Sequence, residues 1–132
     1  MTLVVDASLV VAGLVDSGPD GDWAEGVLGS DDLAAPHLLL AEVANILRRA
    51  SLHAEISPET ASLAHADLLA LNVELFPYAP FANRVWELRR NVTAYDAWYV
   101  ALAETLEAGL ATLDAKLVSA AGPRCEFVTP DG

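Results

Sequence analysis

The chain has little cysteine, little positive charge and no long apolar run. Cys125 is its only cysteine, which excludes an intramolecular disulfide and a cysteine-based metal site and favours a reducing compartment. Lys and Arg number seven against nineteen Asp and Glu, so the formal charge is −12 and the broad basic face usual in nucleic-acid-binding proteins is missing. No stretch approaches the roughly 20 charge-free apolar residues that cross a bilayer, so we expect no membrane association.

The beginning of the chain lacks a basic leader, and its first apolar run, residues 3–5, already ends at Asp6. This pattern does not predict a signal peptide, and we expect a cytoplasmic protein. Hydrophobic residues make up 54% of the 132 residues, and the chain contains no internal repeat, low-complexity segment or linker. Residues 1–132 are therefore expected to form a single domain that buries roughly two-thirds of the surface of its unfolded chain.

Short apolar segments alternate with longer amphipathic ones, which predicts strands and helices in turn. Strands are expected at residues 3–5, 33–35, 73–76, 110–113 and 126–128. Helices are expected at residues 8–14, 22–28, 37–52, 58–71, 80–90, 94–108 and 115–121. Ser8 and Ser57 are the expected N-caps of two helices, and residues 29–32 and Gly109 are expected to end two others. Short strands separated by helices predict an α/β fold with a short central parallel sheet flanked by helices on both faces.

Four carboxylates interrupt segments that are otherwise apolar. Asp6 and Asp114 each follow a predicted strand directly, and Glu42 and Asp96 lie about one turn into predicted helices. In a parallel sheet, the strand ends and the helix starts meet at one edge, where ligands bind. An ionised carboxylate is costly to bury alone, so four of them at one edge indicate a site for a shared cation.

Oxygen ligands of this kind select Mg²⁺ or Mn²⁺. The three histidines lack ligand spacing with one another, which argues against zinc. A divalent ion held by carboxylates activates water and neutralises charge at phosphorus. The favoured reaction class is therefore hydrolysis of phosphodiester bonds by metal-activated water.

Each acid also has a purely structural explanation. Asp6 and Asp114 could be helix N-caps, and Thr93 with Asp96 fits a capping box in which the acid reaches back to the cap amide. Glu42 could be a half-exposed helix residue. The shared site is favoured over these explanations because all four acids fall on one predicted edge.

Four motifs along the chain together resemble a known family. They are Val4-Val5-Asp6-Ala7-Ser8 and the segments 42–49, 95–103 and 111–117. In order and spacing they resemble the PIN-domain ribonucleases and, within them, the VapC-type toxins of bacterial toxin–antitoxin systems. The resemblance covers the whole chain and implies a PIN-like fold.

The resemblance also implies roles for particular residues. The catalytic acids that bind Mg²⁺ or Mn²⁺ would be Asp6, Glu42, Asp96 and Asp114. Polar positions that support the metal or its waters are matched by Thr112, Ser8 and Asn45. Some relatives carry a further acid where this chain has Lys116 and Leu117, so we expect one resident ion and a second that arrives with substrate.

The implied activity is endonucleolytic cleavage of RNA that leaves a 5′-phosphate. The implied partners are the RNA substrate, a cognate antitoxin protein and a second copy of the chain in a homodimer. Candidate contacts to RNA phosphate are Arg49, Arg89, Arg90 and Lys116, although solvated helix faces often carry such residues. Asn45 shares a helix face with Glu42 and is expected to hydrogen-bond to it. Trp86, Trp98 and Tyr99 are expected to pack in the core more than to stack on bases.

The hypothesis is therefore a Mg²⁺-dependent endoribonuclease that acts as the toxin of a VapBC-type system. One alternative is a phosphorylation-dependent receiver-like signalling domain, which also gathers aspartates and Mg²⁺ at strand ends and uses a lysine that Lys116 would match. The irregular alternation of strands and helices argues against it, as does the lack of paired acids before the first phosphoacceptor strand. Another alternative is a catalytically inactive PIN-like binding module, against which the intact set of four acids argues.

Overall fold

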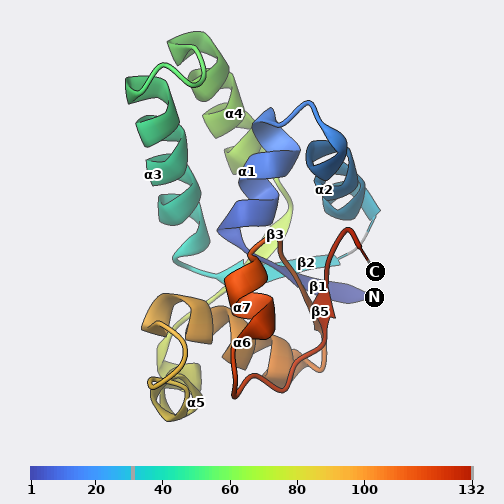
Figure 1. Cartoon of the computed structure of the whole chain (residues 1–132), viewed down its shortest axis with the longest axis vertical. Coiled ribbons are helices and arrows are strands. Elements are labelled where there is room, and N and C mark those ends of the chain that lie inside the picture. Colours follow the sequence, from blue (N-terminus) through green and yellow to red (C-terminus); the bar gives the residue numbers. More distant parts are fainter. Residues whose placement is uncertain (31, 132) are drawn as a thin grey trace.

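A parallel sheet lies at the centre of the molecule (Figure 1). The structure is a computed structural model that describes residues 1–30 and 32–131. In these residues the strands are β1 (Thr2–Val5), β2 (Asp32–Pro36), β3 (Val73–Phe76), β4 (Gly109–Ala111) and β5 (Phe127–Val128). All neighbouring strands pair in parallel, in the order β3-β2-β1-β4-β5. The expected α/β fold with a central parallel sheet is confirmed.

Helices cover both faces of this sheet. They are α1 (Ala7–Val15), α2 (Pro19–Ser30), α3 (Leu39–Leu52), α4 (Pro58–Ala70), α5 (Ala82–Glu87), α6 (Ala94–Leu106) and α7 (Ala115–Ser119), with a 3-10 turn η1 (Ala79–Phe81) before α5. In Figure 1, α1 to α4 lie above the sheet, and α5 and α6 lie below it. In the part of the chain described, no helix is long and apolar enough to cross a membrane.

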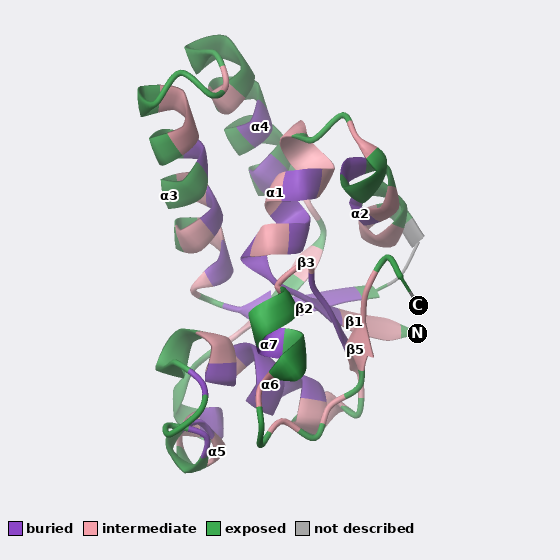
Figure 2. Cartoon of the chain, viewed as in Figure 1, coloured by how far each residue is buried: buried purple, intermediate pink, exposed green. Residues whose placement is uncertain are grey.

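The core lies on both sides of β1 and includes most of α6 (Figure 2). Val4 and Val5 of β1 are fully buried, as are Leu9 and Val10 of α1 on one face of the sheet. Residues 99–103 of α6 are buried as well. Each fully buried valine or leucine side chain stabilises the fold by about 1.5–3 kcal/mol. The packed core therefore fixes β1, which ends directly before Asp6, and α6, which carries Asp96 in its first turn.

Two of the expected helix ends differ from the structure. Asp6 caps α1 in place of Ser8, because its carboxylate follows β1 directly and accepts the N–H of Leu9. Helix α6 ends at Glu107, which adopts a left-handed conformation with φ of 52°, and not at Gly109. Gly109 instead begins β4, where an added Cβ would lie 2.8 Å from the Val128 side chain.

Other element boundaries moved by a few residues. The expected helix at 80–90 is divided into η1, α5 and a turn, because Leu88 closes α5 with backbone bonds to Arg84 and Val85. Strand β4 ends at Ala111, so Asp114 does not follow it directly, contrary to the sequence-based expectation. Helix α2 begins at Pro19, earlier than expected, and Asp31 of its expected stop lies outside the described residues. The cap Ser57 and first-turn Pro58 of α4 are confirmed, with the Thr60 N–H donating to Ser57 Oγ at 3.0 Å.

Candidate active site

Asp6 lies where β1 passes into α1, at the carboxyl edge of the sheet. The residue is 7% exposed, and three donors surround its carboxylate. The Leu9 N–H and the Ser8 hydroxyl donate to Oδ1 at 3.1 and 2.7 Å. The Thr112 hydroxyl, which comes from the segment after β4, donates to Oδ2. These bonds use both lone pairs of Oδ1 and one of Oδ2, so one acceptor position remains on Oδ2.

The Asp6 carboxyl has a pKa above its ordinary value. Burial is the main cause, since it disfavours the ionised form, and the neighbouring Asp114 adds repulsion. Hydrogen bonds from Thr112, Ser8 and Leu9 lower the pKa but do not cancel the effect of burial. Asp6 is therefore a nearly buried carboxylate with hydrogen-bond donors around it, and no cation among residues 1–30 and 32–131 shifts its pKa.

Ser8 and Thr112 join the two chain segments that carry Asp6 and Asp114. Thr112 is fully buried, and its Oγ1 accepts the N–H of Asp114 at 2.9 Å. The Ser8 hydroxyl accepts the N–H of Leu113 at 3.1 Å. Both hydroxyl protons point to Asp6, so the 3.4 Å approach of the two oxygens is a packing contact. The structure thus places two of the three predicted supporting residues, Ser8 and Thr112, against Asp6.

Asp114 is the N-cap of α7. Its Oδ1 accepts the N–H groups of Lys116 and Leu117 at 3.0 and 3.3 Å. No partner is recorded for its other oxygen among the described residues. The capping explanation is therefore correct for Asp6 and for Asp114, yet each carboxylate keeps acceptor capacity on its second oxygen. Capping and ligand binding do not compete for the same atoms.

Glu42 and Asp96 lie in the first turns of α3 and α6, as expected. Glu42 is half-buried, and its Oε1 accepts the Tyr99 hydroxyl at 2.6 Å. Asp96 is also half-buried, and its N–H donates to Thr93 Oγ1 at 3.2 Å, which forms the N-cap half of the expected capping box. Burial raises the pKa of both carboxyls, and Tyr99 and Thr93 partly oppose it by hydrogen bonding.

The four acids act on one another electrostatically. After burial, repulsion from Asp96 and Asp6 raises the pKa of Glu42, and repulsion from Asp114 and Asp6 raises that of Asp96. Among the described residues, every charged group that shifts the pKa of Asp6, Glu42 or Asp96 is another of the four acids. The charges of the four acids, which come from the segment after β1, from α3, from α6 and from the segment before α7, thus influence one another, and their sharing of one cation stays a prediction. Each acid would gain from a nearby cation.

The chemistry of this donor set fits a divalent ion of the Mg²⁺ type. Within residues 1–30 and 32–131, no group of three Asp, Glu, His or Cys side chains forms a ready ligand cluster. Mg²⁺ does not require one, because proteins usually hold it with one or two carboxylates, with waters and substrate phosphate completing its shell. The remaining acceptor position on Asp6 Oδ2 and the second carboxylate oxygen of Asp114 are ligands of this kind.

Tyr99 is a site residue that sequence reasoning missed, and Asn45 does not take the expected position. Asn45 is exposed, and Glu42 is bonded to Tyr99 in the part of the chain that the structure describes. Tyr99 lies in an apolar run, which made it resemble a core residue, and it is indeed 1% exposed. Its place one helical turn after Asp96 was the available signal, because that spacing puts both side chains on one side of α6.

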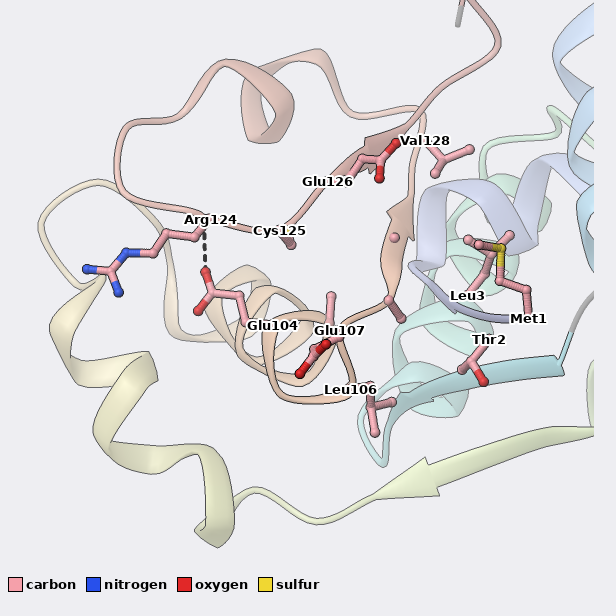
Figure 3. Close-up of a pocket in the computed structure, with 13 residues that line it drawn as sticks. Met1, Thr2, Leu3, Glu104, Leu106, Glu107, Arg124, Cys125, Glu126 and Val128 are labelled. Carbon is pink, nitrogen blue, oxygen red and sulfur yellow. Dashed lines mark hydrogen bonds between the residues drawn. The ribbon is translucent and has the colours of Figure 1, made fainter.

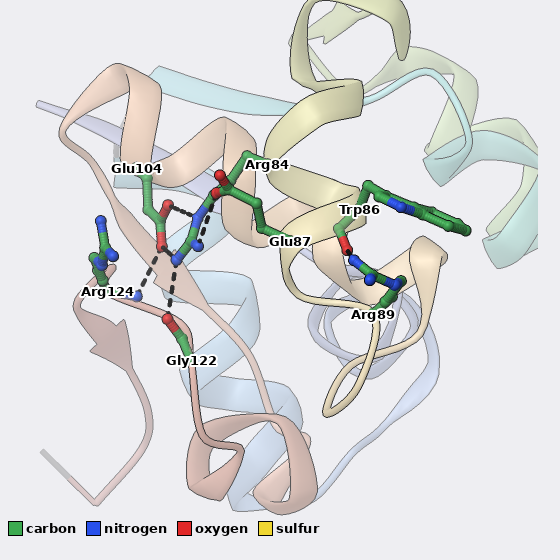
Figure 4. A network of polar contacts seen from close by, with 7 residues as sticks. All are labelled: Arg84, Trp86, Glu87, Arg89, Glu104, Gly122 and Arg124. Atoms are coloured by element: carbon green, nitrogen blue, oxygen red, sulfur yellow. Dashed lines mark hydrogen bonds and ion pairs between the residues drawn. The ribbon is translucent and has the colours of Figure 1, made fainter.

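The candidate RNA-contacting cations are exposed, and each lies within seven residues of one of the four acids in the sequence. Arg49 lies on α3 after Glu42, and Lys116 lies on α7 after Asp114. Arg89 and Arg90 lie in the turn before α6. The expected core packing of Trp86 is wrong, because its side chain is exposed. The Arg89 guanidinium is 4.8 Å from the centre of the Trp86 ring and donates to the Trp86 carbonyl at 2.8 Å (Figure 4).

Arg84 differs from these cations because it is bound within the protein. It donates to both oxygens of Glu104, at 2.7 and 3.1 Å, and to the Gly122 carbonyl at 2.9 Å (Figure 4). It therefore connects α5, α6 and the segment before β5, and is not available for a ligand.

A cavity of about 810 Å³ lies beside the start of β1 (Figure 3). It is lined by the starts of β1 and β4, the end of α6 and the segment around Cys125. None of the four acids lines it. The four acids are therefore separate from this cavity.

Comparison with known proteins adds sequence and structural relatives. The PIN domain family matches residues 3–123. The chain is 45% identical over 125 residues to Ribonuclease VapC1 of Mycobacterium tuberculosis, with 94% of each chain covered.

Two solved structures share the fold. VapC20 of Mycobacterium tuberculosis, a toxin that cleaves the sarcin-ricin loop, superposes with a TM-score of 0.67 at 18% identity, over 89% of this chain and 93% of that chain. VapBC2 of Rickettsia felis, solved with a DNA fragment from its promoter, superposes with a TM-score of 0.68 at 14% identity, over 98% of each chain.

Proposed function

The chain belongs to the PIN-domain family, with VapC-type ribonucleases as its relatives, and from this premise we propose that it is a divalent-metal-dependent endoribonuclease. It acts as the toxin component of a VapBC-type toxin–antitoxin system. The observation that carries the proposal is the raised pKa of three partly desolvated acids, Asp6, Glu42 and Asp96. Among the described residues, the charged groups that shift these pKa values are one another and Asp114, and none is a cation. The ion is Mg²⁺, with Mn²⁺ as the substitute that the same oxygen ligands accept.

Asp6, Asp96 and Asp114 are the residues that would hold the ion. Ser8, Thr112 and the N-terminus of α7 fix the carboxylates of Asp6 and Asp114, so little rotational freedom is lost when a ligand binds. When bound, the ion supplies Lewis acidity at the phosphate and lowers the pKa of water. Glu42 orients the water that attacks phosphorus in line, and no side chain forms a covalent bond to the substrate.

Arg49, Arg89, Arg90 and Lys116 would guide RNA to these acids. Each is exposed and lies within seven residues of one of the acids in the chain, and under this proposal they would meet phosphates on both sides of the cleaved bond. The exposed Trp86 ring beside Arg89 offers a surface on which a base can stack. A local arrangement of this kind offsets the overall charge of −12.

The proposal includes protein partners. Residues 1–132 would act as one nuclease domain in the cytoplasm, as a homodimer, and a cognate antitoxin would cover the acids and so control cleavage. Support for the antitoxin comes from the sequence relative VapC1 and from VapBC2, whose structure was solved with promoter DNA.

The alternatives are less well supported. A receiver-like domain has the strand order 2-1-3-4-5, whereas this sheet has the order β3-β2-β1-β4-β5. An inactive PIN-like binding module would not need desolvated acids that are held in position by neighbouring hydroxyls. Metal titration together with a cleavage assay distinguishes this alternative from an active nuclease.

The proposal is tested by comparing the purified protein with its Asp6→Asn variant on a defined RNA. Cleavage by the wild type is expected in Mg²⁺, with 5′-phosphate ends, and is expected to stop in EDTA. Asp6→Asn should lower the rate by at least about a hundredfold, since an electrostatic contact made in the transition state is lost. Equal cleavage by the two proteins, or cleavage that persists in EDTA, would rule the assignment out.

A further inference from the structure

The Tyr99 hydroxyl forms a bond that crosses from α6 to α3. Tyr99 is 1% exposed, and its hydroxyl donates to Glu42 Oε1 at 2.6 Å, across 57 positions of sequence. A phenol oxygen this deep in an apolar core needs a hydrogen-bond partner, because leaving it without one is costly. The partner here is one of the four acids of the candidate active site.

The direction of this hydrogen bond is fixed. Burial, and then the hydrogen bond and charge of Glu42, raise the pKa of Tyr99, so the phenol keeps its proton and acts as the donor. Glu42 is therefore the acceptor. A hydrogen bond to an ionised carboxylate is shorter and stronger than one between neutral groups, in agreement with the 2.6 Å distance.

The bond restricts a side chain that would otherwise move. Glutamate has three rotatable bonds and loses rotamer freedom when it is held in place. Asp6 and Asp114 are fixed by backbone N–H groups at helix starts, but the recorded hydrogen bond to the Glu42 carboxylate comes from Tyr99. Burial of the Tyr99 ring thus transmits the rigidity of the core to Glu42.

We propose that Tyr99 is a positioning residue, whose hydroxyl holds the Glu42 carboxylate beside Asp6 and Asp96 in the orientation used to bind the divalent ion and orient the attacking water. This inference rests on the proposed nuclease function. It assigns to Tyr99 a role that acts through Glu42, and Tyr99 itself does not touch the substrate.

The test uses Tyr99→Phe, which removes one oxygen and keeps the buried ring. Mn²⁺ binding is measured by calorimetry, and RNA cleavage is measured as kcat and KM. Tyr99→Phe is expected to raise the Mn²⁺ dissociation constant and to lower kcat, each by about ten- to hundredfold, as for other residues that orient a metal ligand. KM for RNA should stay within about twofold of the wild-type value. The matched control is Tyr95→Phe, whose tyrosine is 63% exposed on the same helix, and its Mn²⁺ dissociation constant, kcat and KM should all stay within about twofold.

A second pair of variants tests whether Tyr99 acts through Glu42. In a Glu42→Ala background, adding Tyr99→Phe is expected to leave the Mn²⁺ dissociation constant unchanged, because the acceptor is already gone. A further loss equal to that in the wild type would overturn the proposal, as would a Tyr99→Phe variant with a lower melting temperature but wild-type Mn²⁺ affinity and kcat.

The outcomes separate this inference from the nuclease assignment. If the wild type cleaves RNA, Asp6→Asn does not, and Tyr99→Phe matches the wild type, only the role of Tyr99 is wrong. If the wild type neither binds Mn²⁺ nor cleaves RNA, the proposed function and the role of Tyr99 are both wrong.

Discussion

At the scale of single residues, Asp6 has two roles that use different atoms. Its Oδ1 caps α1, whereas its Oδ2 takes the Thr112 hydroxyl and keeps one free acceptor position. Most caps lie near solvent and can be replaced by Ser or Asn at little cost. Asp6 is only 7% exposed and lies among other acids, which a cap alone does not require. The Asp6 carboxylate therefore has a role beyond capping α1.

The pH dependence of the unfolding free energy in EDTA should reflect the raised pKa values of the buried acids. Burial, with repulsion from other acids, raises the pKa values of Asp6, Glu42 and Asp96 in the folded protein, so the folded state binds protons more tightly than the unfolded chain. The free energy of unfolding should therefore rise as pH falls from 7 toward these raised pKa values. Thermal unfolding between about pH 7 and 5 measures the slope, which should be smaller in Asp6→Asn.

At still lower pH the trend should reverse. Burial would raise the pKa of Glu104, but hydrogen bonds from Arg84 and the Arg124 backbone outweigh it and lower the pKa below its usual 4.5. Stability from this carboxylate is lost as pH falls through its lowered pKa. A stability that falls steadily from pH 7 downward in the wild type would contradict the account of the four acids.

Thr112→Val should damage the site and the fold together. The substitution keeps the shape but removes the donor to Asp6 and the acceptor of the Asp114 N–H, both in a fully buried place. Unfolding free energy should fall by about 1–3 kcal/mol because polar groups lose their partners. Cleavage should fall as well. Thr112→Ser keeps the hydroxyl, so the difference between the two variants in denaturant unfolding and cleavage rates reports the hydroxyl itself.

At the scale of elements, the site depends on how α5, α6 and the last segment are held together. The bidentate bond of Arg84 to Glu104 joins α5 to α6, and its bond to Gly122 joins both to the segment before β5. Both side chains are about four-fifths buried, at 21% and 17% exposed. This connection fixes the C-terminal half of α6, whose other end carries Asp96.

Arg84→Met should destabilise the fold without removing a site residue. A partly buried carboxylate that loses its cation should cost about 1–3 kcal/mol of unfolding free energy. The control is Glu87→Gln, since the Glu87 side chain is 66% exposed in its pair with Arg84 and should matter by under about 0.5 kcal/mol. Urea unfolding of the two variants measures this. Equal losses of unfolding free energy in the two variants would show that the Arg84–Glu104 bond stabilises the fold no more than the exposed Arg84–Glu87 pair does.

Some element boundaries were predictable from sequence because a local signal sets them. Ser57 followed by Pro58 starts α4 as expected, since a cap side chain and a preset φ act within one turn. The end of α6 was not predictable, because Glu107 caps it in a left-handed conformation, whereas Gly109 was expected to end the helix. Gly109 is needed one element later, where β4 lies close to Val128. That close approach depends on tertiary packing and leaves no local signal.

At the scale of the whole molecule, an acidic protein is proposed to act on an acidic polymer. With a net charge of −12, the protein repels RNA at long range, so binding depends on the few exposed cations around the acids and on a divalent ion between acids and phosphate. The parallel sheet makes this arrangement available by bringing acids from distant parts of the chain to one edge.

The candidate site was predictable from the sequence only in part, because part of it depends on tertiary packing. The topology of a parallel sheet indicates where Asp6 and Asp114 lie, because strand ends share an edge, and helix starts add Glu42 and Asp96. Which side chain donates a hydrogen bond to Glu42 depends on how α3 and α6 pack. In the structure the donor is the buried Tyr99 and not the exposed Asn45. The spacing puts Tyr99 on the same side of α6 as Asp96, but it does not show that the hydroxyl reaches Glu42 on another helix.

The most direct test is to locate a bound ion by anomalous scattering from Mn²⁺ in crystals of the wild-type protein. The account predicts an anomalous peak within about 2.5 Å of an Asp6 carboxylate oxygen and of Asp96, Asp114 or both, with no such peak in Asp6→Asn crystals. A Mn²⁺ peak away from Asp6, or crystals that take up none at millimolar Mn²⁺, would contradict it.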